Sequence, residues 1–301
     1  MVLEERIAGQ VRYRRRVRKF TGMTVLNHTR WGLLYLALIV GGFINIYPFL
    51  WMVSVSFKDL PEFARGGLNL IPSVVHWDNY TTAWTEAEFG RYFFNTSFIA
   101  IVPTVTSLLT AAMAGYALAR RNFPGKTIFI VGAVVMMFIP HGFTVIPVFT
   151  IIWKLGLLHT LLGVILPGLS GGLLTALIFM AYYTSVSTGA SELEDAAKID
   201  GATFFQTFWY VMLPLGRPMM ATWGVLGFIG GWNSFIWPLI VSLGNEELRT
   251  LTVGLYAFRE EHMTEWTLLM AGTTIGLVPI IVLFFIAQRW IIEGLAGAIK
   301  A

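Results

Sequence analysis

The feature that most constrains this chain is a series of long apolar runs that contain no Asp, Glu, Lys or Arg. The first run, Trp31 to Val53, has 23 residues. As a helix it would be about 35 Å long, against a hydrocarbon core of about 30 Å in a typical bilayer. Similar runs lie at 92–119, 127–153, 160–187, 219–243 and 266–287. The sequence therefore predicts an all-α polytopic membrane protein with six transmembrane helices.

The composition supports lipid as the main solvent. Only 13% of the residues are charged, whereas a soluble domain averages about 25%. The chain has no cysteine, which excludes disulfides, thiol nucleophiles and thiolate metal sites. There is also no spaced set of His and Glu residues and no Ser-His-Asp order, so we expect neither catalytic residues nor a metal site.

Basic residues predict the orientation in the membrane. With both termini in the cytoplasm, 15 Lys and Arg residues fall on the cytoplasmic side and 6 on the outer side. Short cytoplasmic segments are enriched in Lys and Arg. Eight of the fifteen lie in residues 1–30, which we interpret as a basic cytoplasmic tail preceding one domain at 31–301. This local charge favours an orienting role over nucleic-acid binding.

Two connecting segments are too long to be simple links between helices. Residues 54–91 lie on the predicted outer side, and residues 188–218 lie on the predicted cytoplasmic side. The inner segment reads as two short helices joined by Gly201, with possible capping boxes at Ser191 with Glu194 and at Thr203 with Gln206. Its first helix has an apolar side flanked by acids. This pattern fits a surface for docking a partner, or an amphipathic helix lying on the membrane interface.

The inner segment carries a family resemblance. The run Asp195-Ala-Ala-Lys-Ile-Asp-Gly-Ala202, followed by Leu213-Pro-Leu-Gly-Arg-Pro218, resembles the Glu-Ala-Ala loop of permeases in ATP-binding-cassette (ABC) importers. The resemblance extends over nearly all of the predicted spans. Within the family, the chain is most similar to the carbohydrate-uptake branch, of the maltose-transporter G-subunit type. Asp195 stands where the family has glutamate, so Glu194 is a competing candidate for the leading acid.

This resemblance implies a transport subunit rather than an enzyme. The implied function is to move a sugar, oligosaccharide or related polyol phosphate into the cytoplasm by alternating access. The implied partners are a second homologous permease, two cytoplasmic ATPases that carry ATP and Mg, and an extracytoplasmic binding protein docked on 54–91 and 244–265. The implied localisation is the cell membrane. The implied coupling loop, within 188–218, uses Glu194, Asp195, Ala196, Ala197, Asp200, Gly201, Leu213 and Pro214.

The sequence does not favour ATP binding by this chain itself. Gly125-Lys126-Thr127 matches the end of a phosphate-binding loop, but Arg120 occupies the position that requires a glycine. We therefore expect no cofactor here. The predicted spans also contain no charged residue, whereas proton-coupled transporters usually need one. An energy source in a separate subunit follows from both points.

Three residues are candidates for a substrate pathway. His141 lies in the third predicted span beside Pro140, where it either contacts substrate or is satisfied by carbonyl groups freed at a proline kink. Trp232 and Asn233 offer an aromatic face and an amide, which are groups that sugar-binding sites generally use. The alternative at this pair is an interhelical packing hydrogen bond.

A rival function remains open at this stage. A membrane structural or assembly subunit could use the same cytoplasmic loop to recruit a partner that is not an ATPase. Copurification distinguishes the two functions, because an importer permease should bring down an ATPase and a second permease.

Overall fold

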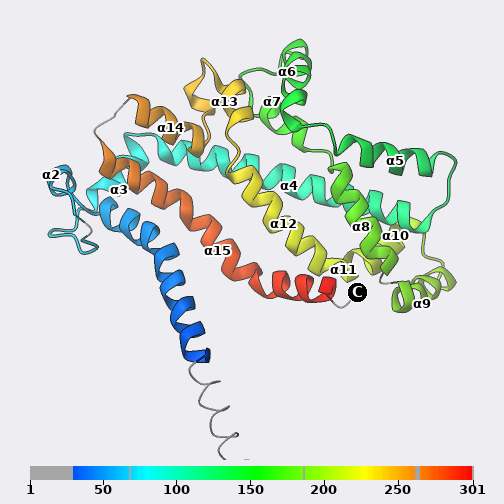
Figure 1. Ribbon diagram of the computed structural model, residues 1–301. Coiled ribbons are helices and arrows are strands. Elements are labelled where there is room, and N and C mark those ends of the chain that lie inside the picture. Colours follow the sequence, from blue (N-terminus) through cyan, green and yellow to red (C-terminus); the bar gives the residue numbers. More distant parts are fainter. Residues whose placement is uncertain (1–29, 68, 186, 262–264, 300–301) are drawn as a thin grey trace, which may run out of the picture.

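The computed structural model describes residues 30–67, 69–185, 187–261 and 265–299 (Figure 1). The predicted basic tail, 1–30, lies outside the described residues except for Arg30. The described part is helical and contains no strand. This agrees with the predicted all-α class.

The helices follow one another with short connections. A first helix spans Arg30–Ser56. The α-helices that follow are α2 (Leu60–Ala64), α3 (Asp78–Thr85), α4 (Phe89–Arg120), α5 (Lys126–Met136), α6 (Val145–Lys154), α7 (Leu161–Ile165), α8 (Leu173–Ser185), α9 (Ser187–Ile199), α10 (Phe204–Thr207), α11 (Leu213–Leu215), α12 (Arg217–Trp232), α13 (Ile236–Ser242), α14 (Leu251–Glu261) and α15 (Trp266–Ile299). Short 3-10 turns lie at His141–Thr144, Leu166–Gly168 and Glu246–Leu248, and a π-helix, η3, lies at Phe208–Met212.

Three of the six predicted spans correspond to single helices of sufficient length, and two more correspond to bent pairs of helices. The first helix, α4 and the Trp266–Arg289 part of α15 are each long and apolar enough to cross a membrane. Two more candidates are bent pairs of helices: Leu161–Gly168 with α8, at an angle of 41°, and α12 with α13, at 45°. The membrane-protein architecture is therefore confirmed, whereas the count of six crossings stays a prediction.

The third predicted span, 127–153, is not one continuous helix. Helix α5 ends at Met136, and Pro140 is extended with φ −61° and ψ 133° before a 3-10 turn begins at His141. Proline lacks a backbone N–H, and it disfavours the helical conformation of the residue before it. The expected kink is thus a break that leaves two shorter apolar helices, Lys126–Met136 and Gly142–Lys154.

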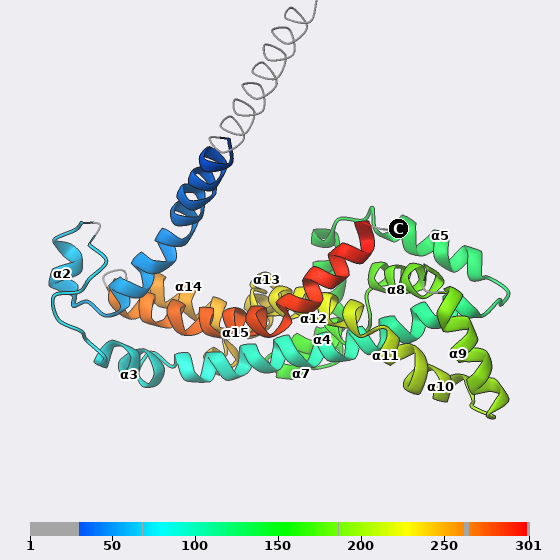
Figure 2. The ribbon, with the colours of Figure 1, turned by 90° about the horizontal axis from the view of Figure 1, so that it is seen from below.

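Helix α4 is the central element of the bundle. It packs against α8 and α12, and α12 in turn packs against α15. Figure 2 shows α4 running along the length of the molecule between two ends. We call these the α3 end, where α2, α3 and α14 lie, and the α9 end, where α9 and α10 lie (Figures 1 and 2). The two long segments singled out in the sequence therefore occupy opposite ends.

The first helix stands apart from this bundle. None of its most apolar stretch is buried against the rest of the chain, and both views show it leaning away from the other helices (Figures 1 and 2). Leu33, Leu38, Ile39 and Ile44 are each more than 60% exposed. An apolar helix without cover in its own chain needs lipid or another protein around it.

Candidate functional site

The α9 end has the two-helix form that the sequence predicts. Helix α9 ends at Ile199, and Gly201 adopts a left-handed conformation with φ +83°. Thr203 then caps α10: its hydroxyl accepts from the Gln206 N–H at 3.3 Å, and its own N–H donates to Gln206 Oε1 at 2.7 Å. The glycine turn and the second capping box are both confirmed.

The first predicted capping box is wrong. Helix α9 begins at Ser187, so Ser191 and Glu194 lie inside the helix rather than at its start. The helix begins four residues before Ser191, which the sequence pattern did not indicate. Backbone N–H groups inside a helix already bond to carbonyl oxygens of the same helix, so they need no side-chain cap.

The turn and the last half of α9 form an exposed face. Asp195, Ala196, Ile199, Asp200 and Gly201 are exposed, and Ile199 has 87% of its surface accessible. Ala197 is half-buried. The Asp195 carboxylate lies 2.8 Å from Lys198 Nζ, in an ion pair in which both side chains are more than 60% exposed. Four of the eight predicted coupling residues, Asp195, Ala196, Asp200 and Gly201, are thus accessible to a partner.

Glu194 has a different position from its neighbour Asp195. Its side chain is 6% exposed, and its Oε1 accepts a hydrogen bond of 2.7 Å from Arg120 Nε at the end of α4. The expectation that both acids face a partner is therefore corrected: Asp195 is on the surface, and Glu194 is paired within the chain.

Leu213 and Pro214 are also internal. They lie in α11, directly after the π-helix, and both are half-buried. Leu213 packs against a core cluster that includes Tyr116, Phe179 and Tyr183. These two residues connect the α9 end to α12 and do not extend the exposed face.

The structure adds Arg120, Tyr116 and Phe204 to the site. The Tyr116 and Phe204 rings stack with centroids 4.5 Å apart, and the Arg121 guanidinium lies 4.6 Å from the Phe204 ring centroid. The only signal in the sequence is an arginine directly after the second predicted span, on the same predicted side as Glu194. Arg120 and Glu194 are 74 positions apart, so spacing alone cannot pair them.

The pathway candidates separate into different environments. Trp232 is buried, and its Nε1 donates to the Gly276 carbonyl oxygen at 3.0 Å. Asn233 is exposed at the end of α12, and its Nδ2 donates to the Ile229 carbonyl oxygen of its own helix at 2.9 Å. The interhelical hydrogen bond weighed for this pair is therefore made by Trp232. The side chain of His141 lies outside the described residues.

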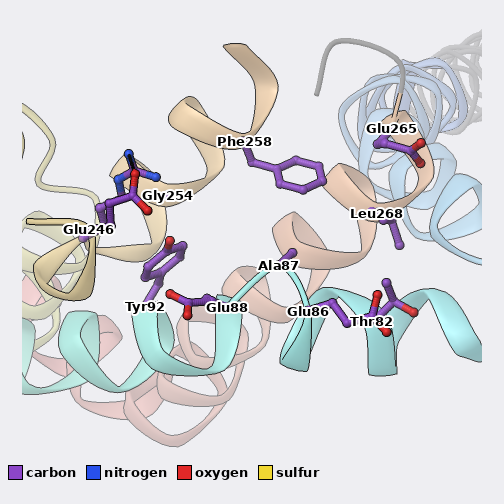
Figure 3. Close-up of a pocket in the computed structure, with 11 residues that line it drawn as sticks. Thr82, Glu86, Ala87, Glu88, Tyr92, Glu246, Gly254, Phe258, Glu265 and Leu268 are labelled. Atoms are coloured by element: carbon purple, nitrogen blue, oxygen red, sulfur yellow. Dashed lines mark hydrogen bonds and ion pairs between the residues drawn. The ribbon is translucent and has the colours of Figure 1, made fainter. Parts of the chain in front are cut away.

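A cavity of about 530 Å³ lies at the α3 end (Figure 3). Its walls come from both segments that the sequence singled out for an outer partner. They are formed by Thr82, Glu86, Ala87, Glu88, Tyr92, Glu246, Arg249, Gly254, Phe258, Glu265 and Leu268. Four carboxylates and one guanidinium surround it, and the Glu246 carboxylate lies 3.0 Å from Arg249. The lining is thus acidic, with Tyr92 and Phe258 as its aromatic walls.

Comparison with known proteins places this architecture in a family. Residues 107–296 match the family described as binding-protein-dependent transport system inner membrane component. The chain is 36% identical to the arabinooligosaccharides transport system permease protein AraQ of Halalkalibacterium halodurans, over 86% of this chain and 92% of that protein. It is 34% identical to the trehalose transport system permease protein SugB of Mycobacterium tuberculosis, over 90% and 97%.

A solved structure agrees with these sequence relatives. The crystal structure of a bacterial ABC transporter involved in the import of the acidic polysaccharide alginate has a chain that superposes with a TM-score of 0.74. The two chains are 25% identical, over 86% of this chain and 95% of the other. The chain therefore belongs to the inner membrane component family of binding-protein-dependent transport systems and is a permease subunit of an ABC importer.

Proposed function

We propose that this permease subunit imports a carbohydrate, namely a sugar, an oligosaccharide or a related polyol phosphate. Relatives of the chain are named for arabino-oligosaccharides and trehalose, and a structural relative takes part in alginate import. Transport proceeds by alternating access in the cell membrane, with both termini in the cytoplasm. Separate subunits supply the ATP hydrolysis.

The working complex contains three kinds of partner. A second, homologous permease completes the pathway, and the uncovered apolar surface of the first helix supports a large contact with lipid or with that subunit. Two cytoplasmic ATPases hold ATP and Mg. A binding protein delivers substrate to the α3 end, where 54–91 and 244–265 together form the cavity in Figure 3.

The exposed face of α9 is the observation that supports docking of an ATPase, on which this import depends. Asp195, Ala196, Asp200 and Gly201 are exposed, and they belong to the second half of α9 and the turn after it. Helix α9 lies at the opposite end of the molecule from α3 (Figure 2). Two alanines and a glycine turn allow another backbone to approach closely, while the exposed acids can pair with basic groups on an ATPase. The exposed pair of Asp195 with Lys198 is weak because solvent screens it, so Asp195 can exchange partners at low cost.

A bulky side chain on this face tests the proposal. Ala196 is exposed, so Ala196→Trp should fold normally but obstruct docking. Ala64→Trp is the matched control, because Ala64 is an exposed alanine of α2 at the α3 end. The ATPase should copurify with the parent and with the control, and much less with Ala196→Trp.

Two results would contradict the proposal. Full recovery of the ATPase with Ala196→Trp would show that this face does not dock it. Copurification of the parent with another cytoplasmic protein and without any ATPase would favour the rival function of a membrane assembly subunit.

A further inference from the structure

The ion pair between Arg120 and Glu194 links the end of α4 directly to α9. Arg120 Nε and Glu194 Oε1 are 2.7 Å apart, and the side chains are only 18% and 6% exposed. The Arg120 Nη2 atom is buried and has no hydrogen-bond acceptor among the residues that the structure describes. Among the described residues, Glu194 is therefore the one carboxylate that forms an ion pair with the Arg120 guanidinium.

Apolar packing between the two helices is interrupted beside this pair. A cavity of about 330 Å³ lies there, lined by Tyr116, Arg120, Arg121, Ser191, Glu194, Lys198, Ala202, Phe204 and Thr207. Most of these side chains are polar or charged. Helix α9 also contacts α8, α10 and the π-helix, so the ion pair is its direct polar link to α4 rather than its only support.

The end of α4 is, by contrast, fixed firmly to the rest of the bundle. Tyr116, one turn before Arg120, stacks on Phe204 and lies 6.0 Å from Tyr183 and 5.7 Å from Phe208, measured between ring centroids. These rings belong to α8, α10 and the π-helix. A displacement applied to Arg120 is therefore passed into several elements of the core.

Helix α4 also reaches the other end of the molecule. Its 32 residues extend for about 48 Å at 1.5 Å per residue. Its first turns contribute Tyr92 to the cavity at the α3 end, and the residue before it, Glu88, lines the same cavity. One helix thus connects the proposed binding-protein surface with the Arg120–Glu194 pair.

We propose that the Arg120–Glu194 pair is the positioning link through which movement of the ATPase-docked α9 enters the spans. The inference rests on the proposed function, since it assumes that an ATPase docks on the exposed face of α9. Glu194 itself does not touch the ATPase: it turns inward, while Asp195 remains on the surface. The two adjacent acids of α9 thus have separate roles: Glu194 attaches α9 to α4, and Asp195 contributes to the docking surface for the ATPase.

The physical reason is the environment of the two charges. Removing one partner leaves the other charge buried and uncompensated, which is far more disruptive than losing an exposed pair. The exposed Asp195–Lys198 pair cannot take over, because Lys198 lies on α9 itself. Without Glu194, α9 can still dock, but its movement loses this direct route to α4 and reaches it only through α8, α10 and the π-helix.

Neutral variants test this inference in the complete complex in proteoliposomes. The variants are Glu194→Gln, Arg120→Gln and the double variant, with Glu192→Gln as control because Glu192 is an exposed carboxylate of the same helix. The measurements are ATPase copurification, basal and binding-protein-stimulated ATP hydrolysis, and ATP hydrolysed per sugar imported. A purely structural role would reduce the yield of complex and leave the last ratio unchanged.

We expect each single variant to keep the ATPase bound but to lose about tenfold or more of the stimulation, which corresponds to about 1.4 kcal/mol. ATP hydrolysed per sugar should rise. The double variant should lose no more than either single variant, because both remove the same link. The control should match the parent.

Failure of the inference can be distinguished from failure of the proposed function. If the parent itself brings down no ATPase, the proposed function is wrong. If the parent does so but Glu194→Gln keeps the stimulation and stoichiometry of the control, only the inference is overturned. Losses that multiply in the double variant would also overturn it, because they would mean that the two residues act independently.

Discussion

A Cβ atom at Gly115 would lie 2.5 Å from the Cβ atom of Phe179, a distance that real Cβ contacts do not show. The same atom would lie 2.8 Å from the Ala176 carbonyl oxygen. Because glycine has no Cβ, Gly115 allows α4 and α8 to approach one another more closely than any other residue at this position would. Small residues serve this purpose at helix contacts in membranes, where close van der Waals packing replaces the hydrophobic effect as a source of stability.

The first prediction follows from this contact. Gly115→Ala should lower the melting temperature of the detergent-purified complex, because the methyl group must displace backbone atoms at a cost of about 1–3 kcal/mol. Gly132→Ala in α5 is the matched control, since a Cβ there meets nothing within 4 Å and alanine is the better helix former. Equal melting temperatures for the two variants would contradict the close contact of α4 with α8.

The second prediction separates the roles of Trp232 and Asn233. Trp232→Phe removes the hydrogen bond to Gly276, and interhelical hydrogen bonds in membrane proteins contribute about 0.6 kcal/mol on average. We expect a small decrease in melting temperature and unchanged sugar uptake per assembled complex. Asn233→Ala should leave the melting temperature unchanged and reduce sugar uptake. The reason is that the Asn233 amide is exposed at the end of α12, just before α13.

Thermal unfolding and uptake into proteoliposomes measure the two effects separately. If Trp232→Phe reduces uptake while the melting temperature is preserved, Trp232 belongs to the pathway despite its burial. If Asn233→Ala leaves uptake at the level of the parent, Asn233 has no role there.

Local patterns predicted the parts of the structure that depend on neighbours in sequence. Charge-free runs identified the long helices, Gly201 marked a left-handed turn, and Thr203 with Gln206 formed a capping box because all the partners lie within a few residues. The break at Pro140 was signalled by the proline, but whether a proline kinks or ends a helix depends on packing from other elements. The predicted span is therefore broken into two helices, Lys126–Met136 and Gly142–Lys154.

Contacts between distant residues could not be predicted in this way. Glu194 was expected on the surface with Asp195 because both are acids on one short helix, and only the fold brings Arg120 to one of them. Asn79, in the outer segment, is another example. It is buried, and its Nδ2 donates to the carbonyl oxygens of Ser56 and Lys58 at 2.9 and 2.8 Å.

The third prediction concerns orientation in the membrane. The chain has no cysteine, so single cysteines report their own accessibility. Thr81 and Lys198 are exposed at the α3 end and the α9 end, respectively, whereas the buried Asn79 would report poorly. We expect an impermeant thiol reagent to label Thr81→Cys in intact cells, and Lys198→Cys only after permeabilisation. The reverse pattern would contradict the orientation inferred from the basic residues.

The fourth prediction isolates the turn between α9 and α10. A Cβ at Gly201 meets nothing within 4 Å, but its φ of +83° is one that side-chain-bearing residues rarely adopt. Gly201→Val should therefore strain the backbone by about 1–2 kcal/mol without any steric clash. Gly201→Asn is the control, because asparagine tolerates the left-handed conformation.

We expect both variants to insert into the membrane, since the turn lies outside the spans. Binding-protein-stimulated ATP hydrolysis should fall with Gly201→Val and stay near the parent level with Gly201→Asn, because only valine displaces the end of α9 from its place beside the turn. If the two variants are equally impaired, a side chain of any kind obstructs docking at this position, and the backbone conformation is not the cause. If both keep full stimulation, the geometry of the turn is not required for coupling, and the docking surface must lie in the preceding residues, Asp195 and Ala196.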